Sequence, residues 1–170
     1  DTGAVTTATS APVSLDVSVD AVADAPSLSV QDASGVEDAG PIALDIDADA
    51  AAQDINGEVV SVTISDVPEG ATLSAGTYDE QTGDWTLTPE DLEGLTISLP
   101  QDFDADFELS VTATAQETDP ETGAVTTATS APVALDVSVM AQVDAPTVEV
   151  SAAAGGEDTA IALDIDPQAA

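Results

Sequence analysis

The chain contains no lysine, arginine or histidine, although it has 34 aspartate and glutamate residues. An ordinary soluble domain has charges of both signs on about a quarter of its residues. Without a cationic side chain no ion pair between side chains can form, so each carboxylate must face water, a backbone donor or a bound cation. Nucleic acids and anionic membranes bind through basic side chains, so we expect neither as a partner.

Cysteine is absent as well, and the only aromatic residues are one Trp, one Tyr and two Phe. No disulfide can form, and the lack of soft ligands argues against zinc, copper and iron sites. Most catalytic bases and nucleophiles are also missing, so we expect no enzyme and assign no catalytic residue. A glycosidase with paired carboxylates would need only acids, but sugar subsites use aromatic platforms. We expect the few aromatics to serve packing and turns instead.

No stretch of about 18 apolar residues is present, so the sequence predicts no membrane span. High net charge with few aromatics is typical of disordered chains. However, 43% of the residues are apolar, and many alternate strictly with polar ones. This alternation favours a folded chain.

The chain repeats itself. Residues 1–19 read DTGAVTTATSAPVSLDVSV, and residues 121–139 read ETGAVTTATSAPVALDVSV. The offset continues beyond this stretch, since IALDID at 42–47 returns at 161–166. A period of about 120 residues is the size of an independent domain rather than of a solenoid unit. We therefore expect a piece of a tandem array.

The phase of the repeat predicts three parts. Residues 1–21 are the C-terminal strand region of one repeat, residues 22–142 are one complete repeat, and residues 143–170 begin the next. The linkers at 20–26 and 142–146 are too short to be flexible spacers. Adjacent repeats should therefore lie nearly in contact.

Apolar and polar residues alternate with period two in many short segments, as in strands with one buried face. About seven or eight strands in one unit predict an all-β fold, namely an antiparallel β-sandwich of immunoglobulin-like type, in tandem. Pro89 after Thr88 marks a helix start, and residues 48–57 form an Ala/Asp-rich connection. The expected strands lie at 13–19, 27–30, 42–46, 60–64, 77–78, 85–87, 95–99, 107–113 and 133–139.

Carboxylates are concentrated in a few places. One set begins within the second strand of the complete unit, another follows Pro100, and single acids lie in the linkers. In the first two sets the acids are two residues apart, so in a strand each set would share one face. The positions are Asp45, Asp47 and Asp49; Asp102, Asp104 and Asp106; Glu37 and Asp38; and Asp24 and Asp144 in the linkers.

Calcium is the cation that this ligand set favours, because Ca²⁺ takes about six to eight oxygen ligands. Neither acidic set fits an EF-hand loop, since the sixth position lacks glycine and the twelfth lacks glutamate. Any calcium site must therefore be assembled from separate loops. The alternative is a solvated acidic face, as in salt-adapted proteins, and for a single Asp on the outer face of a strand this alternative is favoured.

Three motifs give the chain a resemblance to a known family. They are VPEGATLSAG at 67–76, WTLTPEDLEGLT at 85–96 and GGEDTAIALDID at 155–166. Together with their surroundings they resemble the tandem repeats of giant bacterial surface adhesins of the biofilm-associated and repeats-in-toxin type. The extender domains of that family are immunoglobulin-like or cadherin-like. The resemblance covers the complete unit and both flanks.

The resemblance implies a structural extender on the bacterial cell surface or in the biofilm matrix. Such repeats project an adhesive domain, are stiffened by Ca²⁺ at their junctions, and have the neighbouring repeats of the same chain as partners. Alternatives remain a self-associating matrix-fibre subunit and a salt-adapted spacer without specific calcium sites. By resemblance, the candidate ligands are Asp24, Glu37, Asp38, Asp102 and Asp104, with Asp144, Glu157 and Asp158 at the next junction; Asp45 and Asp47 are either ligands or merely exposed.

Overall fold

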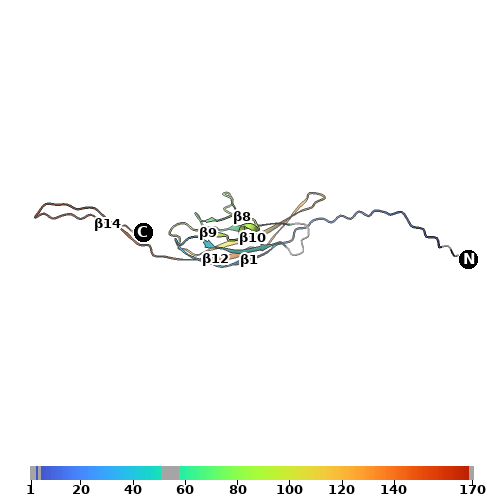
Figure 1. The fold of residues 1–170 in the computed structure, drawn as a ribbon, viewed down its shortest axis with the longest axis horizontal. Coiled ribbons are helices and arrows are strands. Elements are labelled where there is room, and N and C mark those ends of the chain that lie inside the picture. Colours follow the sequence, from blue (N-terminus) through green and yellow to red (C-terminus); the bar gives the residue numbers. More distant parts are fainter. Residues whose placement is uncertain (1–2, 4, 51–57, 169–170) are drawn as a thin grey trace.

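The structure is a computed structural model that describes residues 3, 5–50 and 58–168. Figure 1 shows one folded body, with the N-terminal segment leaving from one end and a hairpin extending from the other. The described residues are all-β and contain no α-helix; the short 3₁₀ turn η1 (Pro89–Leu92) is the only helical element among them. Within these ranges, no helix is long and apolar enough to cross a membrane.

Twelve strands build the body, and two more form the hairpin beyond it, within the described part of the chain. The first six are β1 (Ser27–Gln31), β2 (Ala33–Val36), β3 (Ile42–Ala43), β4 (Asp45–Asp49), β5 (Val59–Ser65) and β6 (Thr72–Leu73). The next six are β7 (Thr77–Tyr78), β8 (Trp85–Leu87), β9 (Thr96–Ser98), β10 (Phe107–Thr118), β11 (Val125–Thr129) and β12 (Val133–Met140). The hairpin consists of β13 (Thr147–Val150) and β14 (Ile165–Gln168).

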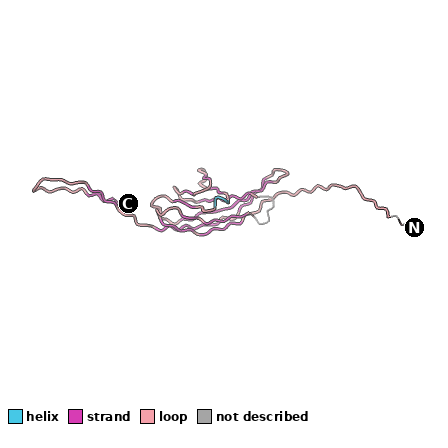
Figure 2. The backbone as a smooth tube through the Cα atoms, in the orientation of Figure 1, coloured by secondary structure: helices cyan, strands magenta, loops and turns pink. Residues whose placement is uncertain are grey.

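The strands form a sandwich-like arrangement of sheets around one core (Figure 2). The largest sheet has the order β2-β12-β10-β5-β8-β7, with β11 also paired to β10. Two smaller sheets, β1-β4 and β3-β9-β6, contribute to the same core from the other side. The two smaller sheets are joined by a hydrogen bond from the Leu44 N–H, between β3 and β4, to the Leu95 carbonyl, just before β9, over 2.9 Å. The strand count exceeds seven or eight because the expected strand at 42–46 is divided into β3 and β4, and because β2, β6 and β11 were not expected.

One pair of strands departs from the expected antiparallel order. Strands β2 and β12 run parallel, with Val137 opposite Ala33. The run from β1 to β2 changes sheets, because β1 pairs with β4 whereas β2 pairs with β12 in the large sheet. Asp32 lies at this crossing, and its Oδ1 accepts the Asp136 N–H over 3.4 Å. The expectation of a wholly antiparallel sandwich is therefore wrong for this pair.

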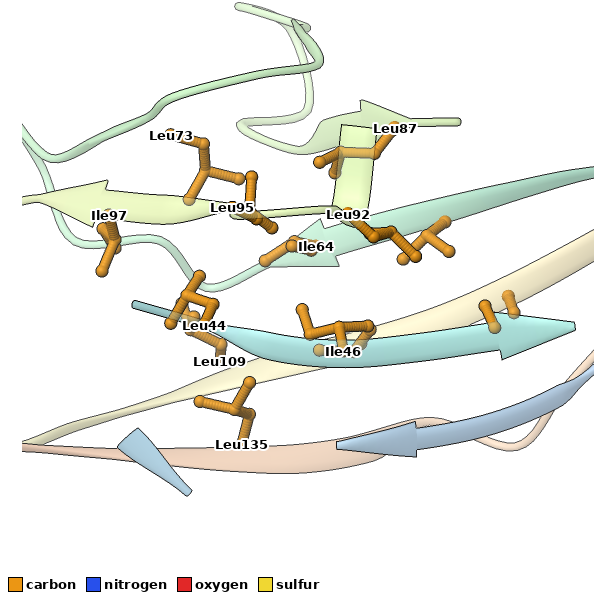
Figure 3. Close-up of a cluster of buried hydrophobic side chains, with 14 of the residues drawn as sticks. Leu44, Ile46, Ile64, Leu73, Leu87, Leu92, Leu95, Ile97, Leu109 and Leu135 are labelled. Atoms are coloured by element: carbon orange, nitrogen blue, oxygen red, sulfur yellow. The ribbon is translucent and has the colours of Figure 1, made fainter. Parts of the chain in front are cut away.

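The core is built from the alternating apolar residues that the sequence predicts. In β10, Leu109, Val111, Ala113 and Ala115 are fully buried, while the residues between them face outward. Figure 3 shows leucines and isoleucines from both sides of the core, with Leu109 from the large sheet and Ile46 and Ile97 from the two smaller sheets among them.

The segment 13–19 does not form the expected strand. Residues 5–20 lie in no strand, and the side chains of Val13, Leu15, Val17 and Val19 are between 73% and 92% exposed. The prediction is wrong here because a strand needs partners for its backbone. In the complete unit the equivalent β12 lies between β2 and β10, and the chain has no second copy of β10 to flank residues 13–19.

Each of the other expected strands overlaps an observed strand, and three observed strands of the body, β2, β6 and β11, were not expected. The expected helix start at Thr88 is confirmed only as the 3₁₀ turn η1, in which the Thr88 N–H and hydroxyl both donate to Asp91 Oδ2 over 2.8 Å. Of the connection expected at 48–57, positions 48 and 49 belong to β4, and residues 51–57 lie outside the described residues.

Candidate metal centre

Three carboxylates come together at the end of the body from which the β13–β14 hairpin extends. Asp38, Asp102 and Asp144 each place an oxygen within 4.8 Å of the other two, and all three residues are exposed. Asp38 follows β2, Asp102 lies between β9 and β10, and Asp144 lies in the linker after β12. The cluster therefore joins two loops of the body to the segment between β12 and β13.

Local backbone conformation positions two of these residues. Asp38 and Asp102 have φ values of 56° and 59°, in the left-handed region. Aspartate is one of the few residues other than glycine that tolerates this region, because its short polar side chain can bond nearby backbone groups. The Asp102 N–H donates to Asp38 Oδ1 over 3.3 Å, which ties the two loops together.

The linker is held in place by two further carboxylates. Glu37 is 9% exposed, its N–H donates to the Met140 carbonyl over 3.0 Å, and its Oε1 accepts the Gln142 N–H. Asp106 Oδ1 accepts the Val139 N–H over 2.8 Å at the end of β12. These contacts fix the chain just before Asp144 and so bring its carboxylate to the cluster.

An aromatic pair anchors the loop that contains Asp102. The Phe103 and Phe107 rings lie edge to face with centroids 5.7 Å apart, and both side chains pack against the core. Edge-to-face contact is a favourable geometry for aromatic rings. The expected packing role of these two residues is therefore confirmed, and it holds Asp102 at the end of the sandwich.

Without a cation, desolvation and repulsion from Asp38 and Asp144 destabilise the ionised form of Asp102. Desolvation raises the pKa of the Asp102 carboxyl above its ordinary value, and the charges of Asp38 and Asp144 together with an Asp144 hydrogen bond raise it further. A divalent cation would reverse this effect, since it stabilises the ionised form. Three carboxylates supply up to six oxygens, and Ca²⁺ completes its flexible shell with backbone carbonyls or water.

The linker acids are grouped differently from the sequence expectation. Asp144 joins Asp38 and Asp102 of the preceding repeat, not Glu157 and Asp158, which lie exposed in the turn of the β13–β14 hairpin. Asp24 is not part of this cluster, and its N–H donates to Glu58 Oε1 over 2.7 Å.

The remaining candidate ligands stay outside the cluster. Asp45, Asp47 and Asp49 share the exposed face of β4, which confirms the expected common face. Residues 101–106 form a turn and loop instead of a strand, so their three acids separate: Asp102 joins the cluster, Asp106 binds β12, and Asp104 is exposed.

Sequence reasoning overlooked acids at the other end of the body. Glu117 and Asp119 are each 4% exposed. Asp119 Oδ1 accepts the Thr122 N–H over 2.7 Å, which lowers the pKa of its carboxyl, and bonds from the Glu121 and Ala21 N–H groups lower it further. The sequence contains a signal for this burial: both residues have odd numbers, and the odd-numbered residues of β10 from Leu109 onward are buried.

Comparisons of the chain with protein-family models, curated proteins and solved structures found no match.

Proposed function

We propose that the chain is part of a structural extender of a bacterial cell-surface adhesin or biofilm matrix protein. Its units are immunoglobulin-like β-sandwiches in tandem that project an adhesive domain, and Ca²⁺ at the junctions stiffens the array. The observation that supports this most is the Asp38–Asp102–Asp144 cluster, because it includes the linker together with two loops of the preceding repeat.

The role is mechanical. Strand β10 has 12 residues, and a strand rises about 3.3 Å per residue, so each repeat adds on the order of 40 Å of length. A Ca²⁺ ion held by Asp38, Asp102 and Asp144 fixes the direction in which the linker leaves the repeat. Without the ion the three carboxylates repel one another and the junction softens.

Calcium binding to the folded state alone also stabilises the fold. By mass action the gain is about 2.7 kcal/mol when the free ion is at 100 times its dissociation constant. Thermal melts test this in chelator, with calcium at about 1 mM, with magnesium at the same level, and with sodium chloride of matched ionic strength. We expect calcium to raise the melting temperature far more than the other two salts.

A matched pair of variants makes the melts specific. Asp102→Asn removes one carboxylate of the cluster, while Asp66→Asn removes one from a position outside the cluster that has a similar φ of 62°. We expect Asp102→Asn to abolish most of the rise with calcium and Asp66→Asn to keep it. Equal rescue by all three salts would contradict specific binding and leave a salt-adapted spacer.

A further inference from the structure

The two linkers of the chain occupy the same position in the repeat but differ in how far they are covered. Ala21 and Ala23, before the complete repeat, are half-buried. Their equivalents Ala141 and Val143 are exposed, Val143 by 95%. The first linker leads into a whole repeat, whereas the second leads only into the β13–β14 hairpin. Some part of a whole repeat therefore covers the linker that enters it.

The covering part is the hairpin formed by β10 and β11. The Ala21 N–H donates to Asp119 Oδ2 over 3.3 Å, and the Ala23 N–H donates to Thr126 Oγ1 over 2.9 Å. Asp119 lies in the tip of this hairpin and Thr126 in β11. Figure 2 shows the hairpin projecting from the end of the body at which the N-terminal segment leaves. Beside it, Glu58 Oε1 accepts the Asp24 N–H.

The second linker shows that a linker also donates a hydrogen bond to the repeat that it leaves. The Gln142 N–H donates to Glu37, which belongs to the repeat that this linker leaves. Gln142 is the equivalent of Val22, which lies between Ala21 and Ala23. Successive N–H groups of an extended chain point to opposite sides. One linker can therefore donate to the repeat behind it at the Val22 position and to the repeat ahead of it at the positions on either side.

We propose that the β10–β11 hairpin of each repeat is a docking clamp for the linker of the repeat before it. In the array, the backbone N–H groups of each linker bind alternately to the preceding and the following repeat. The inference deepens the proposed extender function and rests on its tandem arrangement, but it does not require calcium. It also explains how junctions form in a chain without cationic side chains: linker N–H groups serve as donors to carboxylates, and such charge-assisted bonds are stronger than neutral ones.

Amide hydrogen exchange, measured by NMR on the 170-residue chain in chelator, tests the clamp. We expect the amides of Ala21, Ala23 and Gln142 to exchange more slowly than those of Ala141 and Val143, which are the equivalents of Ala21 and Ala23 in the second linker and the neighbours of Gln142. Equal exchange at Ala23 and Val143 would overturn the proposal. So would protection that appears only after calcium is added, although that result would leave the calcium junction standing. Protection of Ala21 and Ala23 in chelator that calcium does not change would support the clamp, and the calcium site, whose residues are separate from the clamp, is tested by the melts.

Two variants distinguish the clamp from a general effect of strand stability. Thr126→Val removes the hydroxyl that accepts the Ala23 N–H but keeps the shape and the strand propensity of the side chain. Thr127→Val makes the same change at the next, exposed position of β11. A hydrogen bond contributes enough that its loss should speed exchange at Ala23 roughly two- to tenfold in the first variant. An equal change at Ala23 in both variants would contradict the proposal.

Discussion

Residues 13–19 and 133–139 have almost the same sequence but different structures. The second copy is strand β12, in which Leu135 and Val137 are at most 1% exposed. In the first copy, the equivalent Leu15 and Val17 are 86% and 73% exposed. Alternating apolar residues therefore provide one face for burial, but neighbouring strands decide whether a strand forms.

The two copies of the first hairpin, in contrast, have almost the same structure. Strand β13 pairs with β14 in the register of β1 with β4, since Val148 opposite Pro167 repeats Leu28 opposite Ala48. The left-handed Asp158, with φ of 63°, likewise repeats Asp38. The β13–β14 hairpin forms without the rest of a sandwich because its partners are close in sequence, and closing a short loop costs little entropy.

The largest expected effect comes from truncating the same leucine in both copies. Leu135→Ala should destabilise the fold by about 2–5 kcal/mol, because it removes a fully buried side chain and leaves a cavity. Leu15→Ala, at an exposed position, should change the free energy of unfolding by less than about 0.5 kcal/mol. Urea denaturation of both variants measures the difference. Equal losses would show that residues 13–19 are packed in solution.

A glycine pair probes the two hairpins. A Cβ at Gly35 would lie 2.4 Å from Ile42 Cγ1, and Ile42 is 5% exposed. Gly35→Ala should therefore cost about 1–3 kcal/mol through overpacking. At Gly155 the same atom would lie 2.6 Å from Ile161 Cγ1, but Ile161 is 48% exposed and can move. Gly155→Ala should leave the urea midpoint almost unchanged, and a comparable loss would mean that the second hairpin is packed as tightly as the first.

The smallest effect is electrostatic and concerns the two ends of the repeat. The pKa of Asp102 is raised above 3.8 in the folded state, so this state binds more protons there than the unfolded chain does. The contribution of Asp102 to stability therefore falls as the pH rises through and above that value. The pKa of Asp119 is lowered, so its contribution is lost as the pH falls below that value.

In chelator at neutral pH, Asp102→Asn should therefore raise the melting temperature slightly, because it relieves the repulsion with Asp38 and Asp144. Asp66→Asn is the control for the loss of one charge. A melting temperature that rises equally in both variants would show that only the net charge of the chain matters.

Much of the fold could be predicted from local patterns. The alternation in β5, β10 and β12 fixes which side chains enter the core, and the observed burial follows it. Strand β2, with the sequence ASGV, was missed because it has only one large apolar residue. Its parallel pairing depends on the chain passing from one sheet to another between β1 and β2, and no local sequence pattern predicts this passage.

The candidate site was predictable only in part. The sequence identifies Asp38, Asp102 and Asp144 as acids in loops and linkers. Asp24 and Asp144 share the local sequence Asp-Ala-Pro, so no local feature tells which loops each one meets. That grouping follows from the path of the chain at the two ends of the body.

The most direct test of the calcium junction compares Asp38 with its copy Asp158 in one experiment. Backbone amide resonances of the whole chain would be followed by NMR during titration with calcium. We expect the resonances of amides near Asp38, Asp102 and Asp144 to shift together and saturate, while those near Asp158 stay in place because no Asp102 equivalent lies beside it. If the amides near Asp38 and Asp158 shift together, and sodium chloride of matched ionic strength shifts them equally, calcium is not bound at this junction.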